Sequence, residues 1–212
     1  MVASVDGAAT AGGRSGGLGG PADRAVFTVL RSLADVILVG AATARTEHYR
    51  HVSAGQVWPQ LRTGQRPAPA IAVITSSLDL DDCPFLSGPP PRDPEPIVIT
   101  AAAAPPERLA GLAGKARVLI AGEKHVDVTE AISALGGLGY RQILTEGGPR
   151  LLGQLTEAGL VDELCLTISP VIAAGPAGRI ATSPHEHSAP LRLEHVLTDD
   201  DFLLARYVRS AE

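Results

Sequence analysis

The segment Thr145-Glu146-Gly147-Gly148-Pro149 is the strongest candidate for chemistry, because an acid and two glycines stand between an apolar run and a proline that can start a helix. Glycines let a ligand approach the backbone, and the first free N–H groups of a helix attract an anion such as a dinucleotide pyrophosphate. A plain strand-to-helix turn would show the same residues. The segment therefore leaves two interpretations open, a phosphate site and an ordinary turn.

A second junction of this kind is Val39-Gly40-Ala41-Ala42-Thr43, where Gly40 permits close approach and Thr43 offers a hydroxyl. Ligands of open α/β sheets lie beyond the carboxyl ends of the strands, so we expect both junctions to face one crevice. The G-x-G-x-x-G fingerprint is absent from the sequence. A nicotinamide cofactor would therefore bind by a geometry other than that of the doubly wound dinucleotide folds.

The helix predicted to begin at Pro21 carries three charged residues of interest. Asp23 is expected on the apolar side of this helix, where it either interacts with the helix N-terminus or binds the N–H groups of a heterocycle at a pocket edge. Arg24 and Arg31 are seven residues apart and hence share a face. They either clamp a substrate phosphate or are solvated.

The segment Ser4-Val5-Asp6-Gly7 ends the first predicted strand and leads into the glycine-rich residues 8–20. A loop of this composition at a strand end is typical of a flap or a substrate loop. Asp6 is either part of that site or an Asx-turn residue before Gly7.

Other common catalytic arrangements are missing from the sequence. It contains no Walker loop or H-E-x-x-H motif, and its two cysteines, Cys83 and Cys165, form no C-x-x-C. His185 and His187 lack a third ligand, so we expect no metal site. Hydride transfer fits this set of residues, because it needs only the positioning of two bound molecules.

The composition fits one globular domain or two small ones, because 45% of the residues are hydrophobic and 19% are charged. The alternation of strand and helix patterns along the chain predicts one domain over residues 1–212. A formal charge of -5, with 18 basic and 23 acidic residues, gives no reason to expect nucleic acid or an anionic membrane as a partner. We expect a small diffusible ligand. The N-terminus lacks the features of a signal peptide and no long apolar run occurs, so we expect a cytoplasmic protein.

Short β-branched runs alternate with helical patterns, which predicts an α/β fold with a largely parallel sheet. The last three strands lack intervening helices, so we expect them to pair antiparallel at one end of a mixed sheet. Helices are predicted over 22–34, from the Asp127/Glu130 capping box to Gly136-Gly137, and from Pro149 to about Ala158. The predicted strands are 2–5, 36–39, 70–75, 97–100, 117–120, 142–145, 163–168, 191–196 and 202–208.

Together these residues resemble the bacterial riboflavin-biosynthesis pyrimidine reductases, and most closely their stand-alone actinobacterial members. The resemblance runs from Met1 to about Gly175, with a weaker match in the final strands. The residues that carry it are Val2-Ala3-Ser4-Val5-Asp6-Gly7, Ser15, Gly20-Pro21-Ala22-Asp23-Arg24, Leu30-Arg31, the segments 35–47 and 145–152, Leu160-Val161-Asp162-Glu163-Leu164 and Ser169-Pro170.

The resemblance implies a three-layer α/β/α dihydrofolate-reductase-like fold, a homodimer, and NADPH as the hydride donor. The implied reaction reduces the ribosylamino group of 5-amino-6-(5-phosphoribosylamino)uracil, or of a related pyrimidine. Asp23 would then meet a pyrimidine or pterin ring. The candidates for proton delivery are Asp6, Glu47 and Glu146, or a water molecule held by them, and the sequence does not choose between these. The resemblance places Ser4, Asp6, Ser15, Arg31 and Glu47 at the substrate, and Gly40, Thr43, Thr75, Ser76, Gly122, Gly147, Gly148, Pro149 and Leu151 at the cofactor.

Three departures from the family pattern limit this transfer. The chain has neither the H-x-E nor the C-x-x-C of the zinc deaminase found in two-domain members, so we expect no deamination. Relatives carry sequence before the first strand, so we expect a shortened N-terminus here. Thr75-Ser76-Ser77 stands where a 2′-phosphate would bind, without an adjacent basic residue, which leaves the choice between NADPH and NADH open.

Two other functions remain open at this point. One is a weak dihydrofolate reductase activity on a pterin, which Asp23 and the expected fold suggest. The other is a nucleotide-binding protein that keeps the cofactor site but has no turnover.

Overall fold

The computed structural model describes residues 1–81, 83–87 and 93–210. The chain forms two compact units, of which the first comprises Met1–Phe27 with Gly147–Glu212 and the second comprises Thr28–Glu146. Helix α1 (Pro21–Leu33) begins in the first unit and ends in the second. The single domain expected over residues 1–212 stays a prediction.

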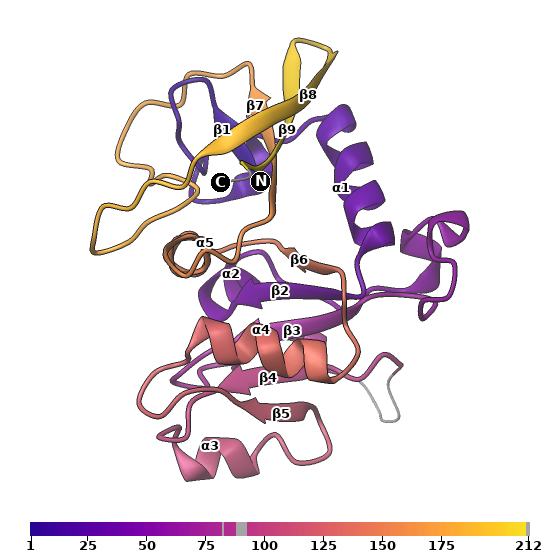
Figure 1. The fold of residues 1–212 in the computed structure, drawn as a ribbon, viewed down its shortest axis with the longest axis vertical. Coiled ribbons are helices and arrows are strands. Elements are labelled where there is room, and N and C mark those ends of the chain that lie inside the picture. The colour runs from indigo at the N-terminus through magenta and orange to yellow at the C-terminus, as the bar shows by residue number, and fades with distance from the viewer. Residues whose placement is uncertain (82, 88–92, 211–212) are drawn as a thin grey trace. The chain divides into compact units, whose positions relative to one another are not determined.

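The second unit is built on a five-stranded parallel sheet with the order β5-β4-β3-β2-β6 (Figure 1). Its central strands are apolar without alternation, as parallel strands covered on both faces are, and every residue from Val36 to Val39 is buried. Because all five strands run the same way, their carboxyl ends lie along one edge. The strands are β2 (Val36–Gly40), β3 (Ala70–Ile74), β4 (Ile97–Thr100), β5 (Arg117–Ile120) and β6 (Ile143–Thr145).

In the described part of this unit, three α-helices and three 3-10 helices connect the strands. Helix α4 buries Val128, Ala131 and Leu135, whose spacing of three and four residues places them on one face. Phe85, in a 3-10 helix, is one of the largest side chains of the core. The helices are α2 (Ala41–Thr46), α3 (Pro106–Ala110), α4 (Val128–Gly137), η2 (Ala54–Gln56), η3 (Pro59–Leu61) and η4 (Pro84–Leu86).

The start of α4 corrects the predicted capping box. Asp127 does cap the helix, because its Oδ1 accepts hydrogen bonds from the N–H groups of Thr129 at 2.8 Å and Glu130 at 3.0 Å. Glu130 does not return to Asp127, whose N–H donates to Ala121 O instead. The Glu130 carboxylate accepts from the Gly122 N–H at 2.7 Å, because the chain turns back on itself at this glycine. Gly122 has φ +88, and a Cβ there would lie 2.3 Å from His125 O.

The C-terminal end of α1 is closed by Arg62, from the segment after η3. Its buried guanidinium donates from Nη1 to Ser32 O and Ala34 O, both at 2.8 Å, and from Nε to Arg66 O at 2.8 Å. The last carbonyls of a helix have no partner within the helix. Arg62 therefore supplies the hydrogen bonds that the end of α1 would otherwise lack.

The first unit contains a four-stranded sheet with the order β1-β7-β9-β8 (Figure 1). β1 runs parallel to β7, and β9 pairs antiparallel with both β7 and β8. Helix α5 packs through Leu151, Leu152 and Leu155, and Gly153 lets the backbone of Thr182 approach it. The elements are β1 (Val2–Ser4), η1 (Ser15–Gly17), α5 (Pro149–Glu157), β7 (Glu163–Ser169), β8 (Leu191–Asp199) and β9 (Phe202–Arg209).

The predicted α/β class, the largely parallel sheet and the antiparallel C-terminal strands are confirmed. The nine strands fall into two sheets where one mixed sheet was expected. The reason is the pairing of β1 with β7, since no ladder within residues 1–81, 83–87 and 93–210 joins β1 to β6.

Candidate active site

The carboxyl edge of the five-stranded sheet brings together six of the predicted site residues. Gly40 ends β2 and Thr43 follows it, Thr75 and Ser76 follow β3, Gly122 follows β5, and Glu146 follows β6. Glu146 continues the pairing of its strand, because its N–H donates to Leu38 O at 3.0 Å. Glu47 lies at the end of α2, where its N–H donates to Thr43 O. Gly40, the last residue of β2, and Glu146, directly after β6, thus stand at the ends of two paired parallel strands. That both junctions face one crevice stays a prediction.

Glu146 is the centre of a partly buried polar cluster in this unit. Its Oε1 accepts from Arg31 Nε at 2.7 Å, and its Oε2 accepts from Arg31 Nη2 at 2.7 Å. The hydroxyl of Tyr49 donates to the same Oε2 at 2.6 Å. The Arg31 guanidinium also lies over the Tyr49 ring, 5.8 Å from its centroid. The parallel-fork geometry is the strongest form of an arginine–carboxylate pair.

Two pKa shifts define the protonation of this cluster. Burial, followed by the charge of Glu146, raises the pKa of the Tyr49 hydroxyl well above its ordinary value. Tyr49 therefore stays protonated and donates a hydrogen bond to Glu146. Burial alone would lower the pKa of Arg31, but the hydrogen bonds and charge of Glu146 outweigh it and raise that pKa. Arg31 is therefore a permanent cation, and both of its Glu146-facing donors are engaged.

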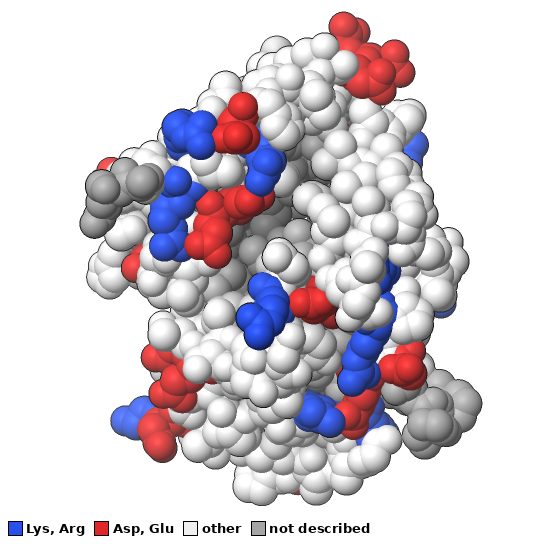
Figure 2. Space-filling view, turned by 45° about the vertical axis from the view of Figure 1, so that its right-hand side comes forward, with Lys and Arg blue, Asp and Glu red and all other residues white. Residues whose placement is uncertain are grey.

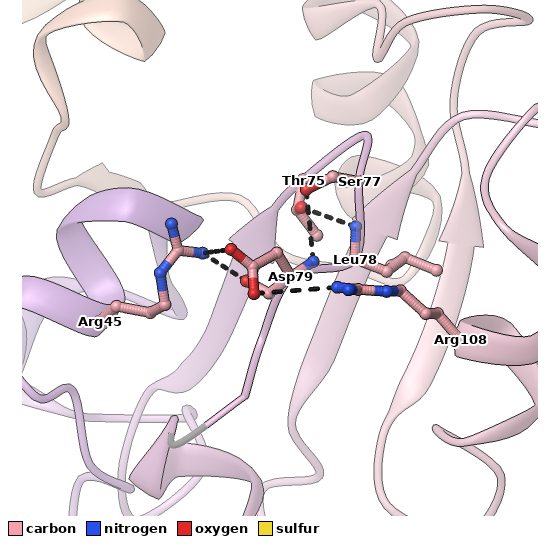
Figure 3. Close-up of polar contacts among 6 residues, drawn as sticks. All are labelled: Arg45, Thr75, Ser77, Leu78, Asp79 and Arg108. Carbon is pink, nitrogen blue, oxygen red and sulfur yellow. Dashed lines mark hydrogen bonds and ion pairs between the residues drawn. The ribbon is translucent and has the colours of Figure 1, made fainter.

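The turn after β3 carries a second cluster, drawn in Figure 3. Asp79 Oδ2 lies 3.2 Å from Arg45 Nη1, and Asp79 Oδ1 lies 3.7 Å from Arg108 Nη1. Arg45 Nη1 also donates to the Asp79 carbonyl. Asp79 lies two residues after Thr75-Ser76-Ser77, so two guanidinium groups stand close to this segment. The segment itself contains no basic residue. Residues 45 and 108 are too distant in sequence for any local pattern to have revealed them.

The donor set at this edge fits a phosphorylated nucleotide. Hydroxyls and guanidinium groups are typical phosphate partners. In addition, Thr145 Oγ1 and Thr100 Oγ1, at the carboxyl ends of β6 and β4, are buried without a hydrogen-bond partner in the described part of the chain. Buried polar atoms are nearly always hydrogen-bonded, so two unpartnered hydroxyls at this edge are consistent with a site for a polar ligand.

Asp6 is held between two loops of the first unit. Its carboxylate accepts hydrogen bonds from the Ser4 hydroxyl and from the N–H groups of Ala173 at 3.0 Å and Ala174 at 2.8 Å. Ser4 Oγ in turn accepts from the Ala8 N–H. The carboxylate therefore links the loop after β1 to the loop after β7, which is more than an Asx turn would do.

These hydrogen bonds, the one from Ser4 first, lower the pKa of Asp6 from 3.8 to about 2. A depressed folded-state pKa contributes stability that is present above the unfolded value and is lost as the pH falls through the folded value. We expect Asp6→Asn to lower the melting temperature at neutral pH, with a difference from wild type that narrows between pH 4 and about 2. Thermal unfolding followed by circular dichroism, with Glu186→Gln as a charge-matched control, measures this. A difference independent of pH would contradict the prediction.

The other predicted residues of the first unit have diverse surroundings. Ser15 opens η1, and Pro149 opens α5. Asp23 folds back over the start of α1, since a Cβ on Gly19 would lie 2.8 Å from its Oδ2. Its ring-binding role stays a prediction. The remaining three are Gly147, with φ +100, Gly148, joined to it by a cis peptide bond, and Leu151, whose side chain is buried.

Within the described residues, no group of three or more His, Cys, Asp and Glu side chains is arranged to hold a metal ion. None of the described helices has the length and apolar character needed to cross a bilayer. On the face drawn in Figure 2, basic and acidic side chains lie next to one another, and most of the visible surface is uncharged.

Comparison with known proteins identifies the family. Residues 1–204 match the RibD C-terminal domain. The chain belongs to this family. Among solved structures, this RibD C-terminal domain is similar to a pyrimidine reductase-like protein from Corynebacterium diphtheriae, at 26% identity and a TM-score of 0.82, over 100% of this chain and 90% of that one. The family that the sequence resemblance indicated is thus confirmed.

Two curated relatives carry the same name, 2,5-diamino-6-ribosylamino-4(3H)-pyrimidinone 5′-phosphate reductase. The domain is 38% identical to the Methanothermobacter thermautotrophicus protein over 42% of this chain and 41% of that protein. It is 26% identical to the Archaeoglobus fulgidus protein over 72% of this chain and 69% of that protein. The match thus spans about two fifths of the first relative's length.

Proposed function

We propose that this RibD C-terminal domain is an NADPH-dependent reductase of riboflavin biosynthesis that reduces the ribosylamino group of a phosphorylated aminopyrimidine. The observation that carries the proposal is the family match over residues 1–204, together with relatives named as pyrimidinone 5′-phosphate reductases. The polar carboxyl edge of the five-stranded sheet supports it, because it offers the donors that a phosphorylated nucleotide needs.

The residues that would hold the cofactor follow from this edge. Gly40 leaves room at the end of β2, and Thr43 lies in the first turn of α2. Thr75 and Ser76 would face the 2′-phosphate end, whereas Gly122 shapes the turn after β5. NADPH, when bound, supplies the hydride, and the protein contributes position and charge. The proposed contacts from Gly147, Gly148, Pro149 and Leu151 rest on the family resemblance.

The substrate-facing roles of Ser4, Ser15, Asp23 and Arg31 are proposed on the same resemblance. Arg31 already binds Glu146 through Nε and Nη2, so any phosphate contact would be made by a guanidinium that the carboxylate holds in place. We therefore propose that Glu146 acts as a positioning residue for Arg31.

Glu47 is our candidate for proton delivery. Asp6, with a pKa of about 2, is ionised at neutral pH and has no proton to give. Both oxygens of Glu146 accept hydrogen bonds from Arg31 and Tyr49. Glu47 is half-buried at the end of α2 and is the third candidate that the family resemblance offers.

The decisive experiment is a turnover assay with purified protein and NADPH. The substrates are 2,5-diamino-6-ribosylamino-4(3H)-pyrimidinone 5′-phosphate, its deaminated counterpart 5-amino-6-(5-phosphoribosylamino)uracil, and dihydrofolate. We expect oxidation of NADPH with one of the two phosphorylated pyrimidines, and a loss of about 10² to 10⁴ in kcat for Glu47→Gln. Turnover of dihydrofolate alone would favour a dihydrofolate reductase activity on a pterin. Binding of NADPH without turnover of any substrate would favour a nucleotide-binding protein.

A homodimer stays part of the proposal. Large apolar side chains are exposed on β8 and in the segment after β7. Exposed apolar area of this kind is typical of subunit contacts. These side chains are Val171, Ile172, Leu193, Val196 and Leu197. Analytical ultracentrifugation distinguishes a dimer from a monomer.

A further inference from the structure

The charged cluster at Asp79 combines two cations with one anion. Arg45 comes from α2 and Arg108 from α3, and both point toward the Asp79 carboxylate in Figure 3. All three side chains are partly exposed, so the cluster is open to a dissolved ligand. Its formal charge is positive by one unit. An anion that binds here would contact two guanidinium groups that are already paired with the Asp79 carboxylate.

The position of Asp79 is set by the turn that carries it. The Leu78 N–H donates to Thr75 Oγ1 at 3.0 Å, and the Asp79 N–H donates to Ser77 Oγ at 3.3 Å. Leu78 is buried in the core although its φ is +53. Because the core holds Leu78, the next residue is directed outward between the two arginines.

We propose that Asp79 determines how strongly this protein prefers NADPH over NADH. The proposal rests on the proposed function, since it takes the nucleotide to bind at this edge of the sheet. NADPH and NADH differ only by the 2′-phosphate, a group that guanidinium pairs bind well. Arg45 and Arg108 bind this phosphate, and Asp79 competes with it for the same donors and repels its charge. The native residue therefore keeps the preference for NADPH modest.

The size of the effect follows from Coulomb's law. A carboxylate a few ångströms from a phosphate dianion, in a partly exposed site, weakens its binding by about tenfold. The same carboxylate has little effect on NADH, which carries a neutral hydroxyl at that position. Removing the Asp79 carboxylate is therefore expected to change the Kd of NADPH while leaving the Kd of NADH nearly unchanged.

The experiment measures the Kd of NADPH and of NADH by calorimetry for wild type and Asp79→Asn. We expect Asp79→Asn to tighten NADPH binding by about tenfold and to change NADH binding by less than about twofold. The gain should disappear when Arg45→Met and Arg108→Met are added to Asp79→Asn. Asp81→Asn removes the same charge from an exposed residue two positions further along, and should leave the ratio unchanged. Melting temperatures verify that each variant is folded.

Three results would overturn the proposal. Equal changes for both nucleotides, or none, would show that Asp79 does not discriminate between them while leaving the proposed function intact. Weaker NADH binding in Asp79→Asn would show that the carboxylate binds the ribose hydroxyls. Failure of wild type and Asp79→Asn alike to bind either nucleotide would overturn the proposed function as well.

Discussion

Glu146→Ala is expected to lower the free energy of unfolding by about 3–5 kcal/mol, because it removes the buried carboxylate that pairs with the largely buried Arg31 cation. The Glu146 side chain is only 3% exposed. It accepts hydrogen bonds from Nε and Nη2 of Arg31 and from the hydroxyl of Tyr49. Urea unfolding measures the effect, and an unchanged m value shows that the same transition is compared. We also expect turnover to fall, since Arg31 and Tyr49 lose their common anchor.

The chain contains a matched control for this variant. Glu163 and Arg206 form a second two-bond pair, with Nε–Oε2 at 2.9 Å and Nη2–Oε1 at 2.6 Å, but Glu163 is 48% exposed. Exposed ion pairs contribute roughly 0–1 kcal/mol to stability, so Glu163→Ala is expected to lower the free energy of unfolding by no more than that. Equal losses for the two variants would show that burial does not decide the strength of the Glu146 pair.

Arg62→Met is expected to destabilise the protein by about 3 kcal/mol, because it leaves several buried carbonyls without a donor. The Arg62 residue is 6% exposed, and its guanidinium closes the end of α1 through Ser32 and Ala34. Methionine retains much of the apolar stem, so the loss reports on the hydrogen bonds. Urea unfolding again gives the measurement.

Arg66→Met is the control for Arg62→Met. Arg66 lies in the same segment and pairs with Asp93 at 3.1 Å, but both side chains are exposed. We expect a change of less than about 1 kcal/mol. A loss as large as that of Arg62→Met would mean that the helix-end hydrogen bonds are not the cause.

The regular elements were predictable because they depend on local sequence. Apolar β-branched runs such as 36–39 and 97–100 form strands in almost any context that buries them. Pro21 and Pro149 start helices because their missing N–H is not needed there. The helices α2 and α3 were not delimited from the sequence, because elements of six and five residues carry too little periodicity to define their bounds.

The candidate site was predictable only in part. Gly40 and Glu146 were found because each stands at the end of an apolar strand, and the carboxyl ends of parallel strands lie along one edge. The role of Glu146 was not predictable, since its partners Arg31 and Tyr49 are 115 and 97 residues away. The pairing of β2 with β6 brings residues this far apart into one unit.

By itself the sequence determined the α/β class, the strands, the start of each long helix and the family to which the chain belongs. Only the tertiary structure decided which charges pair, because such pairs depend on strand order and on where helices end. The Asp127 carboxylate accepts a hydrogen bond from the backbone of its own helix, as local geometry requires, whereas the Glu130 carboxylate accepts one from the Gly122 N–H. Arg45 and Arg108 converge on Asp79 for the same reason, since the order β4-β3-β2 places the segments that follow these strands next to one another.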